Sequence, residues 1–110
     1  MLSEEVRYRL LTLLEPNPRL SQREVARELG FSLGKVNYCL KSLAERGWIK
    51  AANFRNSQNK MAYMYLLTPR GIEEKARVTV RFLQTRMREY EALGNEIRQI
   101  RDEAGRQARR

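Results

Sequence analysis

Four polar or basic side chains between residues 35 and 41 have the chemistry to bind DNA. They are Lys35, Asn37, Tyr38 and Lys41, and in a helix they fall on the side opposite a stripe of apolar residues. Asn can pair with adenine or a phosphate, Lys with guanine or a phosphate, and Tyr can donate to a phosphate or touch a thymine methyl group. An ordinary solvated helix face is the alternative, and the pattern favours DNA contact over it.

Two further pairs of residues extend this candidate set. Ser32 and Gly34 fall at the N-terminal end of the same helix, where free backbone N–H groups can hold a phosphate. Arg55 and Lys60 lie in a later segment rich in turn-forming residues, and could enter the minor groove or grip the DNA backbone. They could also serve only to keep an exposed hairpin edge soluble. Contact with DNA is the favoured interpretation.

The distribution of charge indicates a polyanionic partner. The 110 residues contain 22 Lys and Arg against 13 Asp and Glu, a formal net charge of +9. Residues 1–30 are balanced, whereas residues 31–60 hold six basic residues and only Glu45 as an acid, a net charge of +5. The remaining +4 is spread over residues 61–110. Duplex DNA is therefore the first candidate partner, and RNA is a minor alternative.

Residues 21–50 predict the elements that position these side chains. Ser21 and Glu24 have the spacing of a reciprocal helix cap, and Gly30 can adopt the left-handed conformation that ends a helix. Ser32 is the expected N-cap of a second helix. The apolar residues that recur at helical spacing are Val25, Ala26, Leu29, Val36, Cys39, Leu40 and Leu43. Two such helices joined by a tight turn form a helix-turn-helix, whose second helix suits a DNA major groove.

The flanking segments complete a winged domain. A first helix is expected from Ser3 to about Glu15, and its inward residues are Val6, Leu10, Leu13 and Leu14. After a glycine cap at Gly47, residues 48–51 predict a short strand, residues 53–60 a turn and residues 61–67 a second strand. Such a hairpin with a basic tip behind a helix-turn-helix is a wing.

The predicted fold class is mainly α with a small β-hairpin wing. A winged helix-turn-helix domain spans residues 1–68, and a long C-terminal dimerisation helix spans residues 69–110. Trp48, Tyr63 and Tyr65 are interpreted as structural residues rather than as stacking platforms for bases.

The C-terminal helix predicts a homodimer. Thr68 followed by Pro69 is a helix start, and nothing from there to about Gln107 ends the helix. About forty residues would make a rod of about 60 Å, far longer than this small domain can cover. The expected dimerisation residues, spaced in heptads, are Ile72, Ala76, Thr79, Leu83, Met87, Tyr90, Leu93, Ile97 and Ile100. Arg86 is a charged intruder beside Met87, which can take its place on that face.

Composition excludes several classes of function. The single Cys39 cannot form an internal disulfide and fits a small buried hydrophobe, and without any His a zinc site is not expected. No nucleophile paired with a base and no phosphate-cradling glycine loop is present, so neither an enzyme nor a cofactor is predicted. No apolar run could span a bilayer or serve as a signal peptide. A cytoplasmic protein is expected.

The segment from Ser21 through TPRGIEEK at residues 68–75 resembles the MarR family of winged-helix transcriptional regulators. Arg70 and Gly71 match a turn that this family often shows. The RFLQTRMREYE stretch of the long helix is similar to the exopolysaccharide-associated MarR-type subgroup. The resemblance implies a homodimer that reads a pseudo-palindromic operator, with Ser32, Lys35, Asn37, Tyr38 and Lys41 on the reading helix and Arg55 and Lys60 on the wing.

One departure from that family concerns the N-terminus. Typical members have an additional helix there that interleaves with the C-terminal helices and helps to frame a pocket for phenolic ligands, whereas only Met1 and Leu2 precede the first helix predicted here. The dimer contact is therefore expected on the C-terminal helix alone, which leaves a small-molecule effector site without support.

A winged-helix adaptor that binds another protein is the alternative function. An adaptor would expose apolar anchors where this sequence has Lys35, Asn37 and Lys41.

Overall fold

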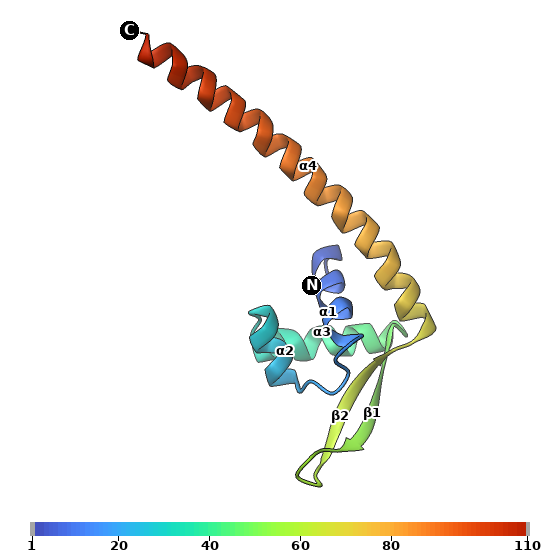
Figure 1. Cartoon of the computed structure of the whole chain (residues 1–110). Coiled ribbons are helices and arrows are strands. Elements are labelled where there is room, and N and C mark those ends of the chain that lie inside the picture. Colours follow the sequence, from blue (N-terminus) through green and yellow to red (C-terminus); the bar gives the residue numbers. More distant parts are fainter. Residues whose placement is uncertain (1, 110) are drawn as a thin grey trace.

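The computed structural model describes residues 2–109 and has an α-helical body, a β-hairpin and one projecting helix (Figure 1). The elements in chain order are α1 (Glu4–Leu14), α2 (Gln22–Leu29), α3 (Leu33–Glu45), β1 (Ile49–Arg55), β2 (Met61–Leu67) and α4 (Pro69–Ala108). This arrangement is a winged helix-turn-helix domain followed by a long helix, which confirms the predicted fold class.

Side-chain caps define where the four described helices begin. Ser3, Ser21, Ser32 and Thr68 each accept a hydrogen bond from the backbone N–H three residues later, as the sequence predicts. Ser21 and Glu24 form the full reciprocal capping box. The predicted glycine stops are also present, because Gly30 and Gly47 have φ angles of 70° and 73°.

The hydrophobic core lies between α1, α2, α3 and the base of the hairpin. All four residues predicted for the inner face of α3 are buried: Val36, Cys39, Leu40 and Leu43. On α1, Leu11 is fully buried although it is not among the residues predicted to face inward, whereas the predicted Leu13 is only partly buried against the same core. Trp48 is also partly buried there, which agrees with its structural interpretation.

The hairpin is longer than predicted. β1 and β2 pair antiparallel from Ile49 opposite Leu67 to Arg55 opposite Met61, so β1 continues four residues beyond Ala51. The turn-forming character of Asn53 suggested an earlier end, but Asn53 pairs with Tyr63 in the ladder. Cross-strand pairing therefore overrides local propensity here, and only residues 56–60 form the turn.

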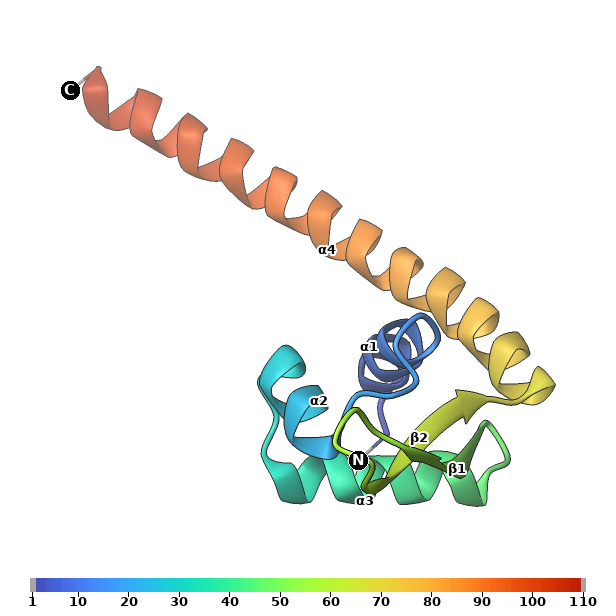
Figure 2. The same ribbon diagram turned by 60° about the horizontal axis from the view of Figure 1, so that its bottom comes forward.

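The first turns of α4 pack on α1, and the rest of the helix projects away (Figures 1 and 2). Val78 is buried at this joint and the ring of Phe82 lies 4.8 Å from that of Tyr8. Ion pairs reinforce the joint: Arg7–Glu74, Lys75–Glu15, Arg81–Glu4 and Arg86–Glu5. The molecule consequently measures 73 × 28 × 22 Å.

Among residues 2–109, no helix has the length and apolar character needed to cross a bilayer. Over the same residues, no cluster of three His, Cys, Asp or Glu side chains is placed to hold a metal ion.

Candidate nucleic-acid interface

The outer face of α3 carries the candidate reading residues. Lys35, Tyr38 and Lys41 are exposed, and Tyr38 is 56% accessible to solvent. The opposite face of α3 holds the buried core residues, so the predicted division of this helix into an inner and an outer face is correct. Figures 1 and 2 show α3 and the hairpin on the side of the domain remote from the distal part of α4.

The N-terminus of α3 is open to solvent. The Ser32 hydroxyl accepts a hydrogen bond from the Lys35 N–H at 3.1 Å, and Ser32 and Gly34 are both exposed. Within the described residues, the N–H groups of Leu33 and Gly34 have no hydrogen-bond partner. These two donors, at the positive end of the helix dipole, have the chemistry of an anion site.

Lys35 is held by the turn that precedes its helix. Its Nζ atom lies 4.0 Å from the centre of the Phe31 ring, and the guanidinium of Arg9 lies 5.1 Å from the same ring. Arg9 also donates to the carbonyl oxygen of Leu29 at 2.9 Å. Phe31 therefore links α1 to the turn and fixes the position of the Lys35 ammonium group at the start of α3.

Asn37 is half-buried and hydrogen-bonded rather than free at the surface. Its Nδ2 atom donates to Oε1 of Gln22 at 3.3 Å, and Nε2 of Gln22 donates to the hydroxyl of Tyr65 at 3.0 Å. This chain of hydrogen bonds joins α3, α2 and β2. Gln22 is not among the predicted site residues, although its place directly after the Ser21 cap puts it on the first turn of α2, facing the next helix.

The wing presents its two predicted cations at the tip. Arg55 ends β1 and donates to the carbonyl oxygen of Asn59 at 3.1 Å, while the backbone N–H of Lys60 donates to Oδ1 of Asn56 at 3.0 Å. Asn59 has a φ angle of 61°, which a tight turn requires. Both Arg55 and Lys60 are exposed.

Tyr63 is not buried in the core, although the sequence was interpreted as giving it a structural role. It is 63% exposed, whereas Tyr65 two residues later is buried as expected. Because successive side chains of a strand point to opposite sides, Tyr63 and Tyr65 lie on the same side of β2. The core covers this side at Tyr65 and leaves it open at Tyr63, nearer the tip of the hairpin. Tyr63 lines two neighbouring surface hollows of about 240 and 200 Å³, next to Lys41 in the first and Arg19 in the second.

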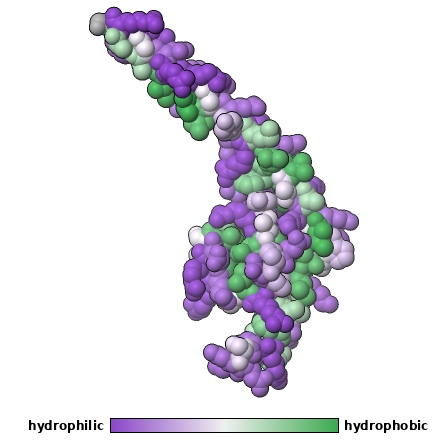
Figure 3. Space-filling view, viewed as in Figure 1, coloured by the Kyte–Doolittle hydropathy of each residue, from purple (hydrophilic) through white to green (hydrophobic). Residues whose placement is uncertain are grey.

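The cations of this surface are not neutralised by carboxylates. Seven ion pairs are present among residues 2–109, and all lie within α4 or between α4 and α1 or Glu15 directly after it. None involves the six basic residues of the 31–60 segment, all of which are exposed: Lys35, Lys41, Arg46, Lys50, Arg55 and Lys60. Figure 3 shows hydrophilic residues over the wing tip. The segment therefore keeps its full charge for an anionic partner.

The residues predicted for dimerisation all lie along α4 and are exposed. They are Ile72, Ala76, Thr79, Leu83, Met87, Tyr90, Leu93, Ile97 and Ile100. Arg86 lies at the joint with α1, where it pairs with Glu5 and Glu89 and its guanidinium lies 4.8 Å from the centre of the Phe82 ring.

Comparison with known proteins agrees with this architecture. Residues 3–50 match the family model described as winged helix-turn-helix DNA-binding. No significant match was found among curated proteins.

Solved structures with the same fold include several transcriptional regulators. The PcaV regulator from Streptomyces coelicolor, in complex with its natural ligand, is 23% identical with a TM-score of 0.62, over 87% of this chain and 72% of that one. A MarR/EmrR family regulator from Acinetobacter sp. ADP1 is 21% identical with a TM-score of 0.62, over 77% and 58%. Streptococcus pneumoniae FabT in complex with DNA is 23% identical with a TM-score of 0.53, over 76% and 56%.

Proposed function

We propose that this chain is a sequence-specific regulator of transcription that binds double-stranded DNA as a homodimer. In this proposal α3 enters the major groove and the hairpin contacts the adjacent minor groove or backbone. The observation that carries the proposal is the set of six exposed cations without an ion-pair partner between residues 31 and 60. They lie on α3, directly after it and on the hairpin, and a DNA-binding family model matches residues 3–50.

The side chains have different tasks in this proposal. The N–H groups around Gly34 and the Ser32 end of α3 hold a phosphate, while Lys35, Asn37 and Lys41 contact base edges. Tyr38 contacts a phosphate or a thymine methyl group.

The wing cations have a different task. Arg55 and Lys60 contact the DNA backbone at the edge of the site, which contributes affinity for any sequence.

The homodimer is proposed on the basis of the exposed apolar residues of α4. They extend over several turns of a helix whose polar face is already well solvated, and a second copy of the chain covers them with a closed two-fold contact. Two copies present two reading helices, which matches a pseudo-palindromic site.

The similarity of the long helix to the exopolysaccharide-associated subgroup suggests which genes are regulated. We propose that exopolysaccharide genes are the targets. A separate test compares binding to promoters of polysaccharide genes in the source genome with binding to unrelated promoters.

The central experiment compares binding to the DNA upstream of the protein's own gene with binding to random duplex of equal length. A regulator prefers its own upstream DNA, protects a defined footprint there and loses affinity steeply as salt rises, because neutralised phosphates release counterions. Equal affinity for both duplexes at every salt concentration would contradict the proposal and favour the protein adaptor instead.

A further inference from the structure

The distal part of α4 has no support from the rest of the chain. Beyond Glu89, and within residues 2–109, α4 makes no hydrogen bond or ion pair with another element. Its apolar side chains are nevertheless large and exposed, and Tyr90 is 79% accessible. A lone helix of about twenty residues is only marginally stable in water, and packing of an apolar face is what stabilises such helices in proteins.

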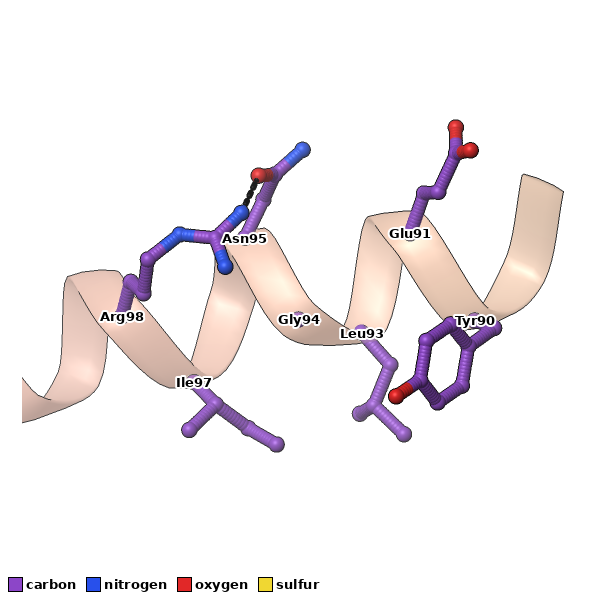
Figure 4. A pocket seen from close by; sticks show the side chains of 7 residues that line it. All are labelled: Tyr90, Glu91, Leu93, Gly94, Asn95, Ile97 and Arg98. Carbon is purple, nitrogen blue, oxygen red and sulfur yellow. Dashed lines mark hydrogen bonds between the residues drawn. The ribbon is translucent and has the colours of Figure 1, made fainter. Parts of the chain in front are cut away.

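The apolar side chains of this segment lie on one side of the helix. Figure 4 shows Tyr90, Leu93 and Ile97 extending to the same side, and Glu91 and Asn95 extending to the other. A row of large, uncovered apolar side chains on one side of a helix is the surface that packs against a partner helix in a coiled coil.

The spacing assigns these residues to heptad positions. The a positions are Ala76, Leu83, Tyr90, Ile97 and Ala104, and the d positions are Ile72, Thr79, Arg86, Leu93 and Ile100. Arg86 is the exception at position d, and its ion pair with Glu5 explains why it is tolerated at the joint with α1. The uninterrupted apolar core therefore begins at Tyr90.

The charges that flank this core are separated by type. The g positions along the distal helix are all acidic, namely Glu89, Glu96 and Glu103, whereas Arg101 is the charged residue at position e. Glu89 and Glu103 already pair with arginines of their own helix, while Glu96 and Arg101 have no ion-pair partner among the described residues.

This separation distinguishes the two ways in which a second helix can run. In a parallel pair, each g residue faces the e residue five positions later in the other chain, so Glu96 meets Arg101 of the second copy twice per dimer. In an antiparallel pair, g faces g, and three glutamates would gather against three glutamates along one flank. Like charges in contact are destabilising, so the parallel arrangement is favoured.

We infer that the distal half of α4 pairs with that of a second copy as a parallel, in-register coiled coil. This inference rests on the homodimer of the proposed function and adds its direction, register and ion pairs. A parallel coil holds both winged domains at the same end, because α3 and the hairpin lie near the start of α4 (Figure 1). An antiparallel coil would hold them at opposite ends of a rod of about 60 Å.

Charge reversal tests the direction of the coil. Glu96→Arg and Arg101→Glu are each expected to weaken dimerisation by about 3- to 10-fold in low salt, and the double variant to recover most of the loss. Sedimentation equilibrium of the full chain measures the dissociation constants. Glu91→Arg is the matched control, since Glu91 points away from the apolar side (Figure 4), and no change is expected. Tighter dimerisation by Glu96→Arg, or no recovery in the double variant, would overturn the parallel arrangement.

Cross-linking tests the register. In a Cys39→Ala background, Ile100→Cys places two thiols opposite each other only in a parallel in-register pair, so mild oxidation should give a covalent dimer. Asn95→Cys lies on the other side of the helix and should not cross-link. Absence of the Ile100→Cys dimer would refute the register. If the covalent dimer forms but does not prefer its own upstream DNA, the proposed function is wrong and the parallel coiled coil is correct. If the protein prefers that DNA but no covalent dimer forms, only the parallel coiled coil is rejected.

Discussion

The carbonyl oxygen of Trp48 lies 1.8 Å from the point where a β-carbon on residue 71 would stand, so only a glycine fits at Gly71. The same carbonyl accepts a hydrogen bond from the Thr68 N–H at 3.1 Å, which fixes its position. The Thr68 hydroxyl in turn donates to the carbonyl oxygen of Gly47. The first turn of α4 is therefore packed backbone to backbone against the base of the hairpin, and this contact sets the direction of the long helix.

Gly71→Ala is expected to destabilise the protein. The added methyl group meets backbone atoms rather than a flexible side chain, so α4 must shift away from Trp48, at a cost of about 3 kcal/mol or more. Chemical unfolding followed by circular dichroism measures the change. Gly105→Ala is the matched control because, apart from the adjoining backbone of its own helix, nothing lies within 4 Å of the added carbon. Alanine there should stabilise the helix by up to about 1 kcal/mol. Equal effects of the two substitutions would contradict the close approach.

Among the carboxylates at the joint between α1 and α4, Glu74 is expected to be the one whose removal lowers the stability of the fold most. It is only 6% exposed and accepts hydrogen bonds from Arg7 and Arg77, each at 2.8 Å. Glu74→Ala leaves the poorly exposed guanidinium of Arg7 without a carboxylate partner, and a loss of about 3 kcal/mol in the free energy of unfolding is expected. Glu103→Ala, which removes a solvent-exposed pair with Arg106, should cost less than about 1 kcal/mol.

The capping box of α2 should make part of the stability depend on pH. Hydrogen bonds from the backbone and hydroxyl of Ser21 lower the pKa of the Glu24 carboxyl below its ordinary value. The pKa of Glu24 is therefore lower in the folded protein than in the unfolded chain. Its ionised carboxylate stabilises the fold at every pH above the pKa of the unfolded chain, and this stabilisation is lost as the pH falls through the pKa of the folded protein. When the free energy of unfolding is measured from neutral to acidic pH, it should therefore fall less steeply for Glu24→Gln than for the unmodified protein.

The same capping box has a second readout. Ser21→Ala removes the cap and should cost about 1 kcal/mol at neutral pH. Carboxyl NMR titration should then show the pKa of Glu24 moving up towards its ordinary value. Because the backbone N–H of residue 21 remains in the variant, an unchanged titration curve would mean that the Ser21 hydroxyl does not contribute to the lowered pKa.

Local signals in the sequence were sufficient for most of the fold. Helix starts such as Ser32 and stops such as Gly47 act through neighbouring backbone groups, so their types and spacing determine them. The end of β1 was predicted wrongly because it depends on the pairing of Asn53 with Tyr63, which is a contact between strands. Propensity along the chain carries no information about that partner.

The candidate interface was predictable only in part for the same reason. The exposure of Lys35 and Lys41 follows from helical periodicity, and the structure agrees with it. The bond between Asn37 and Gln22 joins two helices, and the exposure of Tyr63 depends on how far the core extends under the hairpin. Neither property is encoded in the spacing of residues along one element.

Gln22 is expected to act as a positioning residue for DNA recognition. It holds the Asn37 amide through Oε1 and is itself held by the Tyr65 hydroxyl, so Gln22→Ala frees Asn37 to rotate. The loss of one hydrogen bond of this kind is worth about 1 kcal/mol, or about fivefold in affinity for the specific site. Binding to random duplex should change little, and Gln99→Ala on α4 serves as a control for the specific site. A uniform loss on all duplexes would assign Gln22 to backbone contact instead.

Reading and gripping residues should separate in a binding assay. Lys35→Ala and Asn37→Ala are expected to cost about 1 to 3 kcal/mol on the specific site and to relax discrimination at particular base pairs, because α3 would contact base edges. Arg55→Ala should weaken binding to specific and random duplex alike and reduce the salt slope by about 1, since a phosphate contact carries no sequence information. Titrations of both duplexes at several salt concentrations measure these effects.

Arg109→Ala, at the far end of α4, removes the same charge and is the control; it should leave discrimination between the two duplexes unchanged. If Lys35→Ala and Arg55→Ala gave the same uniform loss, α3 would be gripping the backbone rather than reading bases.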